Sequence, residues 1–171
     1  VAALKASKQG WACVGHKLDY AHRAWIQPGH WLTSDMQKAN EDAAALYESW
    51  KKDVQVEEYR LEDAEVVLTA YGISARICKS AVELLRAQGV KAGLIRPITV
   101  HPFPYAAYDH IDYSKVKAVL DVEMSIPAQF VDDVAVAVKD RCLIETCLCS
   151  GGNIMSRDKV LAAVKKIMEG K

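Results

Sequence analysis

A proline-rich stretch in the middle of the chain carries side chains that can bind an anion or a carboxylate. It reads Arg-Pro-Ile-Thr-Val-His-Pro-Phe-Pro from Arg96 to Pro104 and follows an apolar run. Because Pro97 keeps the preceding residue out of a helix, Arg96 should project from an extended backbone. A planar guanidinium in that position suits a carboxylate from a ligand, a neighbouring loop or a partner subunit. We favour a structural ion pair over substrate binding, since ion pairs also hold such loops.

A second polar stretch, Glu-Met-Ser-Ile-Pro-Ala-Gln from Glu123 to Gln129, follows a later apolar run. Both stretches should lie at the carboxyl ends of strands, so Glu123 is the expected partner of Arg96. Asp132 and Asp133 fall in the first turns of the next predicted helix, where negative charge offsets the helix dipole. No histidine is spaced to complete a metal site with these carboxylates.

The histidines and cysteines do not predict a catalytic centre. His101 belongs to no Ser-His-Asp or Cys-His arrangement. Cys147 and Cys149 form Cys-x-Cys, which places two small side chains on one buried strand face and matches no iron–sulfur spacing. We therefore predict no catalytic, cofactor-binding or metal-binding residue in this chain. The candidates for an interface or for anchoring loops are Arg96, Pro97, His101, Phe103, Glu123, Gln129 and Asp132.

A glycine turn, Tyr71-Gly72-Ile73-Ser74, joins a predicted strand to a predicted helix. Backbone N–H groups at such a turn can hold an anion. However, the chain contains neither Gly-x-Gly-x-x-Gly nor Gly-x-x-x-x-Gly-Lys-Ser/Thr. A tight turn that needs the backbone freedom of glycine is therefore the favoured interpretation.

Alternating strands and helices must position these residues. The predicted strands are Val66–Ala70, Lys91–Ile95, Val116–Val122 and Cys142–Leu148. The predicted helices start at a Ser74 cap and stop at Gly89, run from Tyr105 to His110, start at Pro127, and start at a Ser156 cap. Such alternation implies right-handed crossovers and an open, mostly parallel sheet between two helical layers, a three-layer α/β/α fold.

The N-terminal part has a different pattern. Residues 1–33 contain three of the four tryptophans, Trp11, Trp25 and Trp31, and predict an irregular arm. A Ser-x-x-Gln capping box at Ser34 then opens an amphipathic helix of about five turns. Residues 54–60 either extend that helix or form an entry segment. We place the boundary after residue 60, so that 1–60 links from a preceding domain and 61–171 forms the α/β domain.

Composition excludes several classes of protein. Lys plus Arg equals Asp plus Glu at 22 each, which argues against a nucleic-acid or anionic-membrane binder. No apolar run approaches the roughly 20 residues of a membrane-spanning helix, and no signal peptide is visible. Five cysteines, an odd number, fit reduced thiols in the cytoplasm. The start at Val1 fits a piece of a longer polypeptide or a trimmed terminus equally.

Three motifs, in this order, resemble the C-terminal part of the alpha subunit of 2-oxoacid:ferredoxin oxidoreductases. They are the turn at Tyr71-Gly72, the run Gly-Leu-Ile-Arg-Pro-Ile-Thr with His-Pro-Phe-Pro, and the Glu-Met-Ser loop with its Gln and two Asp residues. The resemblance covers about residues 20–171. The glycine that the family usually has before Gln129 is Ala128 here.

This resemblance implies a transketolase C-terminal-like domain that helps to assemble an anaerobe's multi-subunit enzyme. The family uses thiamine diphosphate, coenzyme A and iron–sulfur clusters to decarboxylate 2-oxoacids to acyl-CoA. The implied partners are a beta subunit, a cluster-bearing small subunit and, indirectly, ferredoxin. The branched-chain members, which act on 2-oxoisovalerate, are the most similar, and the 2-oxoglutarate members are close. This chain alone should be inactive.

Two alternatives stay open. The first is the C-terminal domain of a transketolase or of a 2-oxoacid dehydrogenase beta subunit, against which the Arg-Pro-Ile-Thr and Pro-Phe-Pro run argues. The second is a freestanding α/β module that binds an anion or another small ligand. Titration of the chain with coenzyme A, thiamine diphosphate and 2-oxoacids would separate that module from an assembly domain.

Overall fold

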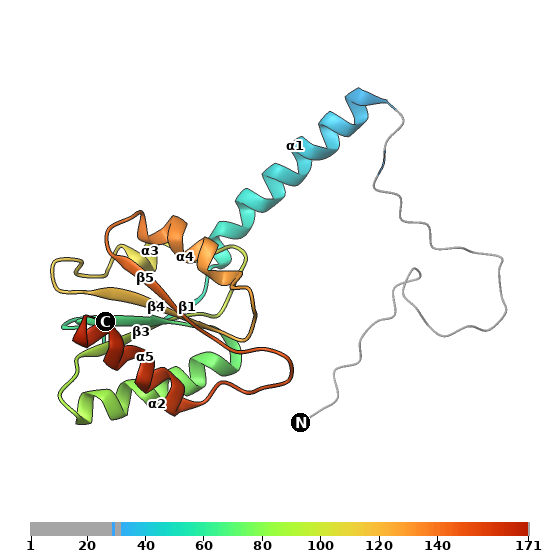
Figure 1. Cartoon of the computed structure of the whole chain (residues 1–171). Coiled ribbons are helices and arrows are strands. Elements are labelled where there is room, and N and C mark those ends of the chain that lie inside the picture. Colours follow the sequence, from blue (N-terminus) through green and yellow to red (C-terminus); the bar gives the residue numbers. More distant parts are fainter. Residues whose placement is uncertain (1–28, 30–31, 171) are drawn as a thin grey trace, which may run out of the picture. The chain divides into compact units, whose positions relative to one another are not determined.

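A computed structural model describes residues 29 and 32–170 of the chain (Figure 1). In chain order the elements are α1 (Thr33–Trp50), a short 3-10 helix (Lys51–Asp53), β1 (Val56–Tyr59), β2 (Val66–Thr69), α2 (Gly72–Ala87), β3 (Ala92–Pro97), α3 (Tyr105–Tyr108), β4 (Ala118–Glu123), α4 (Phe130–Val138), β5 (Leu143–Leu148) and α5 (Arg157–Glu169). The chain divides into two units between Leu46 and Tyr47, and the second unit carries the sheet. In the described part, no helix has both the length and the apolarity that a bilayer crossing requires.

The sheet has five strands in the order β1-β3-β2-β4-β5. Strands β2, β3, β4 and β5 are parallel, and β1 pairs antiparallel with β3 at one edge. The fold class predicted from the sequence is confirmed. Because the chain leaves β2 for β3 on one side and later reaches β4 on the other, the strand order reverses between β2 and β4. Ligands of open α/β sheets are usually bound outside the carboxyl ends of strands at such a point.

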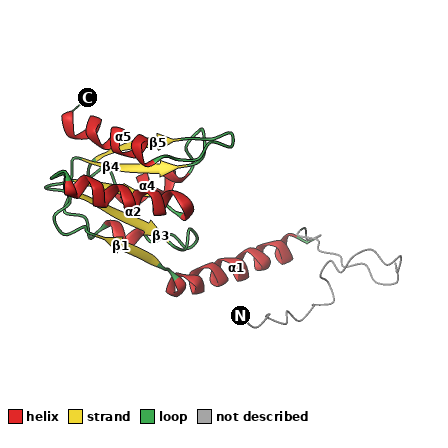
Figure 2. Cartoon of the chain, turned by 90° about the horizontal axis from the view of Figure 1, so that it is seen from below, coloured by secondary structure: helices red, strands yellow, loops and turns green. Residues whose placement is uncertain are grey.

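Helices cover both faces of the sheet. Figure 1 shows α2 and α5 on one face and α3 and α4 on the other, and Figure 2 shows α2 and α5 side by side. The cluster beneath α2 and α5 includes Leu68, Leu85, Leu94 and Val160, and all four side chains are fully buried. The other cluster surrounds Tyr108 and Phe130. Cys147 and Cys149 are both buried in the first cluster, as the Cys-x-Cys spacing predicted.

Several helix starts differ from the sequence-based expectation. Ser74 does not cap α2 but lies buried within it, because the helix already begins at Gly72, whose φ of +56° suits glycine. Helix α4 begins at Phe130, three residues after Pro127. The cap at Ser156 is confirmed, since its hydroxyl accepts a hydrogen bond of 3.2 Å from the backbone of Lys159. Gly89, with a φ of +83°, follows the end of α2 as predicted.

The segment before the sheet also differs in part. Helix α1 has the predicted five turns, but it begins at Thr33, so Ser34 lies inside it, and none of its residues is buried. The residues after it neither extend the helix nor form a simple entry segment, because 56–59 make the edge strand β1. Trp11, Trp25 and Trp31 and the predicted arm lie outside the described residues.

Candidate functional site at the carboxyl edge

The segments that follow the parallel strands form what we call the carboxyl edge: residues 70–73, 98–105, 124–129 and 149–156. At the reversal of strand order, between the segments after β2 and β4, lies a hollow of about 160 Å³. Its lining consists of Tyr71, Gly72, Ile73, Ser74, Val122, Glu123, Met124, Ser125 and Gln129. The glycine turn and the Glu-Met-Ser loop, which the sequence singled out separately, therefore meet at this point.

Glu123 organises the loop after β4. Its carboxylate is 2% exposed and accepts hydrogen bonds from the backbone N–H of Gln129 at 2.8 Å and of Phe130 at 3.2 Å. The hydroxyl of Ser125 donates to the same carboxylate. Burial alone would raise the pKa of Glu123, but these donors favour the ionised form and together hold the pKa below its usual value. The ionised Glu123 thus anchors the start of α4.

A second carboxyl group, Asp121, lies two residues earlier on the same face of β4. It is fully buried, and neither of its oxygens has a hydrogen-bond partner among the described residues. Burial, reinforced by the negative charge of Glu123, raises the pKa of Asp121 to about 8. Thr69 lies opposite Asp121 on the neighbouring strand β2, and its hydroxyl is hydrogen-bonded at 2.5 Å to the hydroxyl of Tyr108 of α3. Asp121 is therefore a neutral acid at pH 7 beside an ionised Glu123.

The predicted pairing of Arg96 with Glu123 is wrong. Strand β2 lies between the strands that carry these two residues, so the sheet order separates them. Instead, Arg96 donates from Nη1 to Glu57 of β1 at 3.0 Å, directly across the antiparallel pair. The sequence was right that Arg96 forms a structural ion pair, but it gave no indication of the partner.

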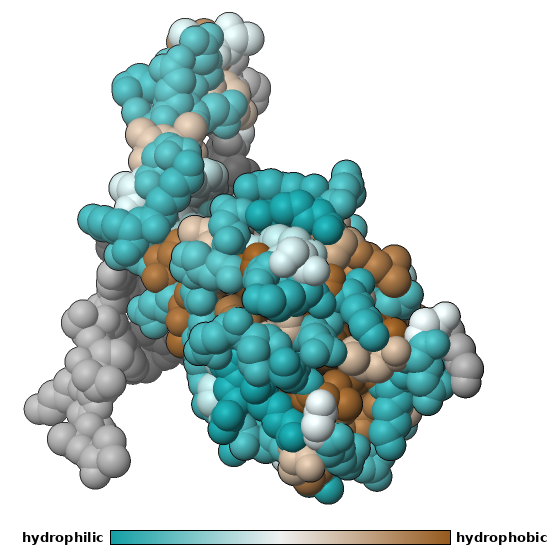
Figure 3. Space-filling view, turned by 90° about the vertical axis from the view of Figure 1, so that its left-hand side faces the viewer, coloured by the Kyte–Doolittle hydropathy of each residue, from teal (hydrophilic) through white to brown (hydrophobic). Residues whose placement is uncertain are grey.

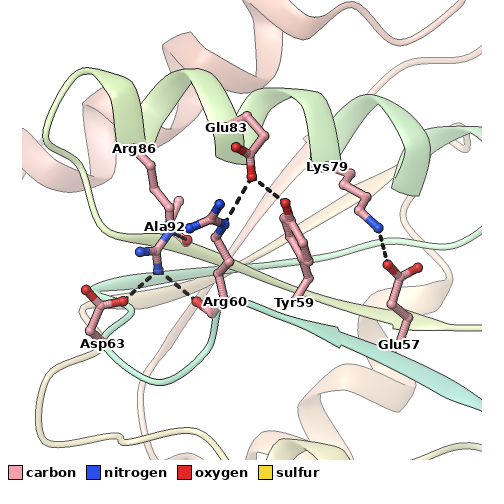
Figure 4. A network of polar contacts seen from close by, with 8 residues as sticks. All are labelled: Glu57, Tyr59, Arg60, Asp63, Lys79, Glu83, Arg86 and Ala92. Carbon is pink, nitrogen blue, oxygen red and sulfur yellow. Dashed lines mark hydrogen bonds and ion pairs between the residues drawn. The ribbon is translucent and has the colours of Figure 1, made fainter.

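Glu57 belongs to a series of ion pairs that joins β1 to its neighbours (Figure 4). It accepts from Lys79 of α2 as well as from Arg96 of β3. The hydrogen bond from Lys79 lowers the pKa of the Glu57 carboxyl most, and the hydrogen bond from Arg96 lowers it further. Further along, the carboxylate of Glu83 of α2 accepts a hydrogen bond from the Tyr59 hydroxyl and forms an ion pair with Arg60 at 3.1 Å. These contacts fasten the edge strand to the helix that covers it.

The proline-rich stretch packs through its aromatic residues. Pro97 is buried at the end of β3. Phe103 is buried, and its ring stacks on Tyr108 with a centroid distance of 5.6 Å. His101 is exposed and lies edge-on to the rings of Tyr47 and Trp50, at 5.9 Å from each. The stretch thereby forms one wall of an apolar groove of about 660 Å³.

The remaining candidates lie at the start of α4. The side chain of Gln129 is exposed and lines the hollow at the strand-order reversal. Asp132 is exposed in the first turn of the helix, where its charge offsets the dipole. The structure thus brings Glu123 and Gln129 together, leaves His101 elsewhere along the carboxyl edge, and places Arg96 within β3.

Metal ligands and thiols are the next groups to consider among the described residues. These residues contain no cluster of three or more His, Cys, Asp or Glu side chains that would hold a metal ion. Burial raises the pKa of Cys78, Cys142 and Cys147, so these thiols are protonated and poorly nucleophilic at neutral pH. The hollow at the strand-order reversal is smaller than the ~300 Å³ of ordinary ligand pockets.

Exposed apolar side chains gather at the carboxyl edge. Of the thirteen large apolar residues exposed in the described part of the chain, eight lie there: Tyr71, Ile73, Ile98, Val100, Tyr105, Met124, Ile126 and Ile154. Figure 3 faces the opposite end of the sheet, where α2 and α5 end, and hydrophilic residues cover most of that surface. An edge rimmed by apolar side chains is typical of a surface that contacts another protein.

Sequence reasoning missed Asp121, Glu57 and Lys79. A signal for Asp121 was present, because an aspartate inside the apolar run Val-Leu-Asp-Val is unusual in a buried strand. Glu57 and Lys79 carried no such signal. They lie in segments that also contain many solvated charges, and only the fold brings them together.

Comparison with solved structures defines the class of fold. A split-gene transketolase, described as an inactive beta4 tetramer, matches with a TM-score of 0.54 and 18% identity over 66% of this chain and 41% of its own. A 2-oxoglutarate:ferredoxin oxidoreductase from Magnetococcus marinus, with 2-oxoglutarate, coenzyme A and succinyl-CoA bound, matches with a TM-score of 0.66 and 19% identity over 81% of this chain and 24% of its own. At these identities the likeness shows the fold alone, a transketolase C-terminal-like α/β domain.

Sequence comparison identifies the family. The model of the pyruvate:ferredoxin oxidoreductase core domain II matches residues 64–160, more than half of the chain, so the chain belongs to that family. The ketoisovalerate oxidoreductase subunit VorB of Methanothermobacter marburgensis is 40% identical over 117 residues. The match covers 68% of this chain but only 32% of that relative, so the chain spans about a third of its length. The resemblance to alpha subunits of 2-oxoacid:ferredoxin oxidoreductases is confirmed.

Proposed function

We propose that this chain is the assembly domain of the alpha subunit of a thiamine-diphosphate-dependent 2-oxoacid:ferredoxin oxidoreductase. In this role it contributes a docking surface rather than catalytic groups. The observation that carries the proposal is the apolar carboxyl edge in a chain of this family, since eight exposed large side chains there are suited to burial against other subunits. Ionised Glu123 and the ion pairs of Glu57 hold that edge in shape.

The proposed substrate of the complete enzyme is 2-oxoisovalerate. The 40% identity to a ketoisovalerate oxidoreductase subunit supports this choice over 2-oxoglutarate, for which the relatives are less extensive matches. The proposed partners are a beta subunit that holds the diphosphate of the cofactor and a small subunit that carries iron–sulfur clusters. We propose a cytoplasmic location for the complex.

The proposal is tested by expressing the complete subunit that contains this chain together with the other subunits from the same genome. A tag on this chain should retain the other subunits through size-exclusion chromatography. The assembled complex should reduce ferredoxin with 2-oxoisovalerate and coenzyme A, and the chain alone should not. Turnover by the chain alone, or recovery of the chain without partners, would contradict the proposal. A higher kcat/KM for 2-oxoglutarate would overturn only the choice of substrate.

A further inference from the structure

Two of the arginines that the structure describes have no carboxylate partner among the described residues. The described residues include six arginines, and four of them form ion pairs: Arg60 with Glu83, Arg86 with Asp63, Arg96 with Glu57 and Arg141 with Asp109. Arg76 of α2 and Arg157 of α5 form no ion pair and no side-chain hydrogen bond within the described part of the chain, and both side chains are exposed. Within the described part of the chain, the charges of these two guanidinium groups are therefore available to an external partner.

The two unpaired arginines line the same hollow. It has a volume of about 570 Å³ and opens between the beginnings of α2 and α5, which lie side by side in Figure 2. The rest of its lining consists of Ile73, Ile77, Ser80 and Asp158. Asp158 carries the one carboxylate of this lining and pairs with neither guanidinium. Two arginines against one aspartate leave the hollow with a formal charge of +1 in a chain whose net charge is zero.

The positive charges of Arg76 and Arg157 do not stabilise the helices that carry them. Arg157 is the first residue of α5, and Arg76 lies in the second turn of α2. The amino-terminal end of a helix carries partial positive charge, so a cation there is unfavourable and an anion is favourable. Since neither guanidinium forms an ion pair within the described residues and Asp158 offsets only one of the two charges, a carboxylate from outside would be attracted by both guanidinium groups and by the helix ends together.

The surroundings fit a protein surface better than a small anion. The hollow is open to solvent and contains Ile73, which is 54% exposed, while Ile154, 69% exposed, lies three residues before Arg157. Arginine combined with large apolar side chains is typical of the energetically important centre of protein interfaces. A site for a free anion would instead draw on buried donors that converge on one point, and both arginines here are exposed.

We propose that Arg76 and Arg157 form a docking site for an acidic segment of a partner subunit, whose Asp or Glu carboxylates pair with both guanidinium groups. This inference rests on the proposed function, because it assigns one specific contact in the complex to the helix ends that adjoin the carboxyl edge. Each guanidinium can bind a carboxylate with two parallel hydrogen bonds, so the pair fixes orientation as well as charge. Ile73 and Ile154 supply the apolar contact beside the acidic segment.

The test measures assembly of the complex with the chain in its natural subunit. In Arg76→Gln/Arg157→Gln the affinity for the other subunits should fall at least about tenfold, and its salt dependence should become flatter. The matched control is Lys165→Gln/Lys166→Gln, which changes the net charge equally at the opposite end of α5. Both control residues are exposed, and the control affinity should equal that of the wild type.

A conservative variant identifies the partner group directly. Arg76→Lys/Arg157→Lys keeps the charges and should retain most of the affinity. It also introduces amines that a carbodiimide joins to adjacent carboxylates without a spacer. The expected product links position 76 or 157 to an Asp or Glu of another subunit, as mass spectrometry of the complex would show.

The outcomes separate this inference from the function on which it rests. If the wild-type chain retains its partners and the double Gln variant binds equally well, the docking site is wrong and the assembly function stands. Equal loss in the lysine control, or absence of the cross-link, also overturns the docking site. If the wild-type chain retains no partner, the proposed function and the docking site are wrong together.

Discussion

Asp121 is the residue whose chemistry departs most from that of an ordinary side chain of its type. Its pKa of about 8 in the folded chain exceeds the ordinary value near 4. Between these values the Asp121 carboxyl binds more protons in the folded state than in the unfolded state, so its contribution to stability falls as pH rises from about 4 to 8. The slope contributed by one such group approaches about 1.4 kcal/mol per pH unit.

Asp121→Asn should remove that slope, because an amide keeps the shape of the side chain and does not ionise. We expect urea unfolding at pH 5.5, 6.5, 7.5 and 8.5 to show a smaller loss of stability in the variant than in the wild type. Asp53→Asn replaces an exposed aspartate and serves as the control, which should follow the wild type. Parallel curves for Asp121→Asn and the wild type would show that Asp121 is ionised throughout.

Gly93 is the second residue with a specific constraint. A Cβ atom at this position in β3 would lie 2.8 Å from the backbone oxygen of Arg60 and 2.9 Å from Cδ2 of Leu61. A backbone atom cannot move aside as the end of a flexible side chain can, so the added methyl group would clash. Gly93→Ala should therefore destabilise the chain by about 1–3 kcal/mol. Chemical denaturation measures the loss. Gly29→Ala, where no atom lies within 4 Å of the added carbon, should leave stability unchanged.

At the level of elements, β1 depends on side chains of its neighbours. It is a short edge strand, and Glu57 joins it to Lys79 of α2 and Arg96 of β3. Glu57→Gln should cost about 0.5–1 kcal/mol, and added salt should reduce the difference from the wild type. Because the pKa of Glu57 is lowered in the folded chain, its contribution is present above the unfolded pKa and is lost as pH falls.

The neighbouring Glu58 gives a matched control on the same strand. Among the described residues its carboxylate pairs only with the exposed His110, whose Nδ1 lies 2.9 Å away. Glu58→Gln should therefore cost less than Glu57→Gln, and hydrogen exchange of the β1 amides should accelerate more in the Glu57 variant. If the two variants lost equal stability at neutral pH, the ion pairs of Glu57 would contribute nothing particular to β1.

These elements also show how much of the fold could be predicted from the sequence. Strand β2 (Val66–Thr69) is a buried apolar run that ends in one threonine, and β3 and β4 are mostly apolar. The loops after α2, β3, β4 and β5 carry glycine, proline or serine, so local pattern predicted the α/β fold. Strand β1 was missed because its four residues, Val-Glu-Glu-Tyr, are mostly polar and form a strand through pairing with β3. The partner of Arg96 was missed for a related reason, since the order of strands in a sheet depends on contacts far apart in sequence.

In the molecule as a whole, many charged side chains pair with groups of the chain itself, while large apolar side chains are exposed at the carboxyl edge. Glu123 accepts hydrogen bonds from its own loop, and four of the six described arginines pair with carboxylates of the chain. Local sequence predicted Glu123 and Gln129 at this edge, but it did not predict that the apolar residues of four separate segments share it. That grouping is a property of the parallel topology, which brings the ends of successive strands to one side.

Substitution of one apolar residue at the carboxyl edge tests whether that side is the interface. Ile126, in the segment after β4, and Val136, on the outer face of α4, are each 62% exposed. Because both are exposed, glutamate at either position should leave the melting temperature of the chain nearly unchanged. Ile126→Glu should nevertheless weaken assembly with the other subunits by about tenfold or more, since an interface that buries this side chain would have to desolvate a charge without a partner. Val136→Glu should assemble as the wild type does, and equal assembly of both variants would exclude the loop after β4 from the interface.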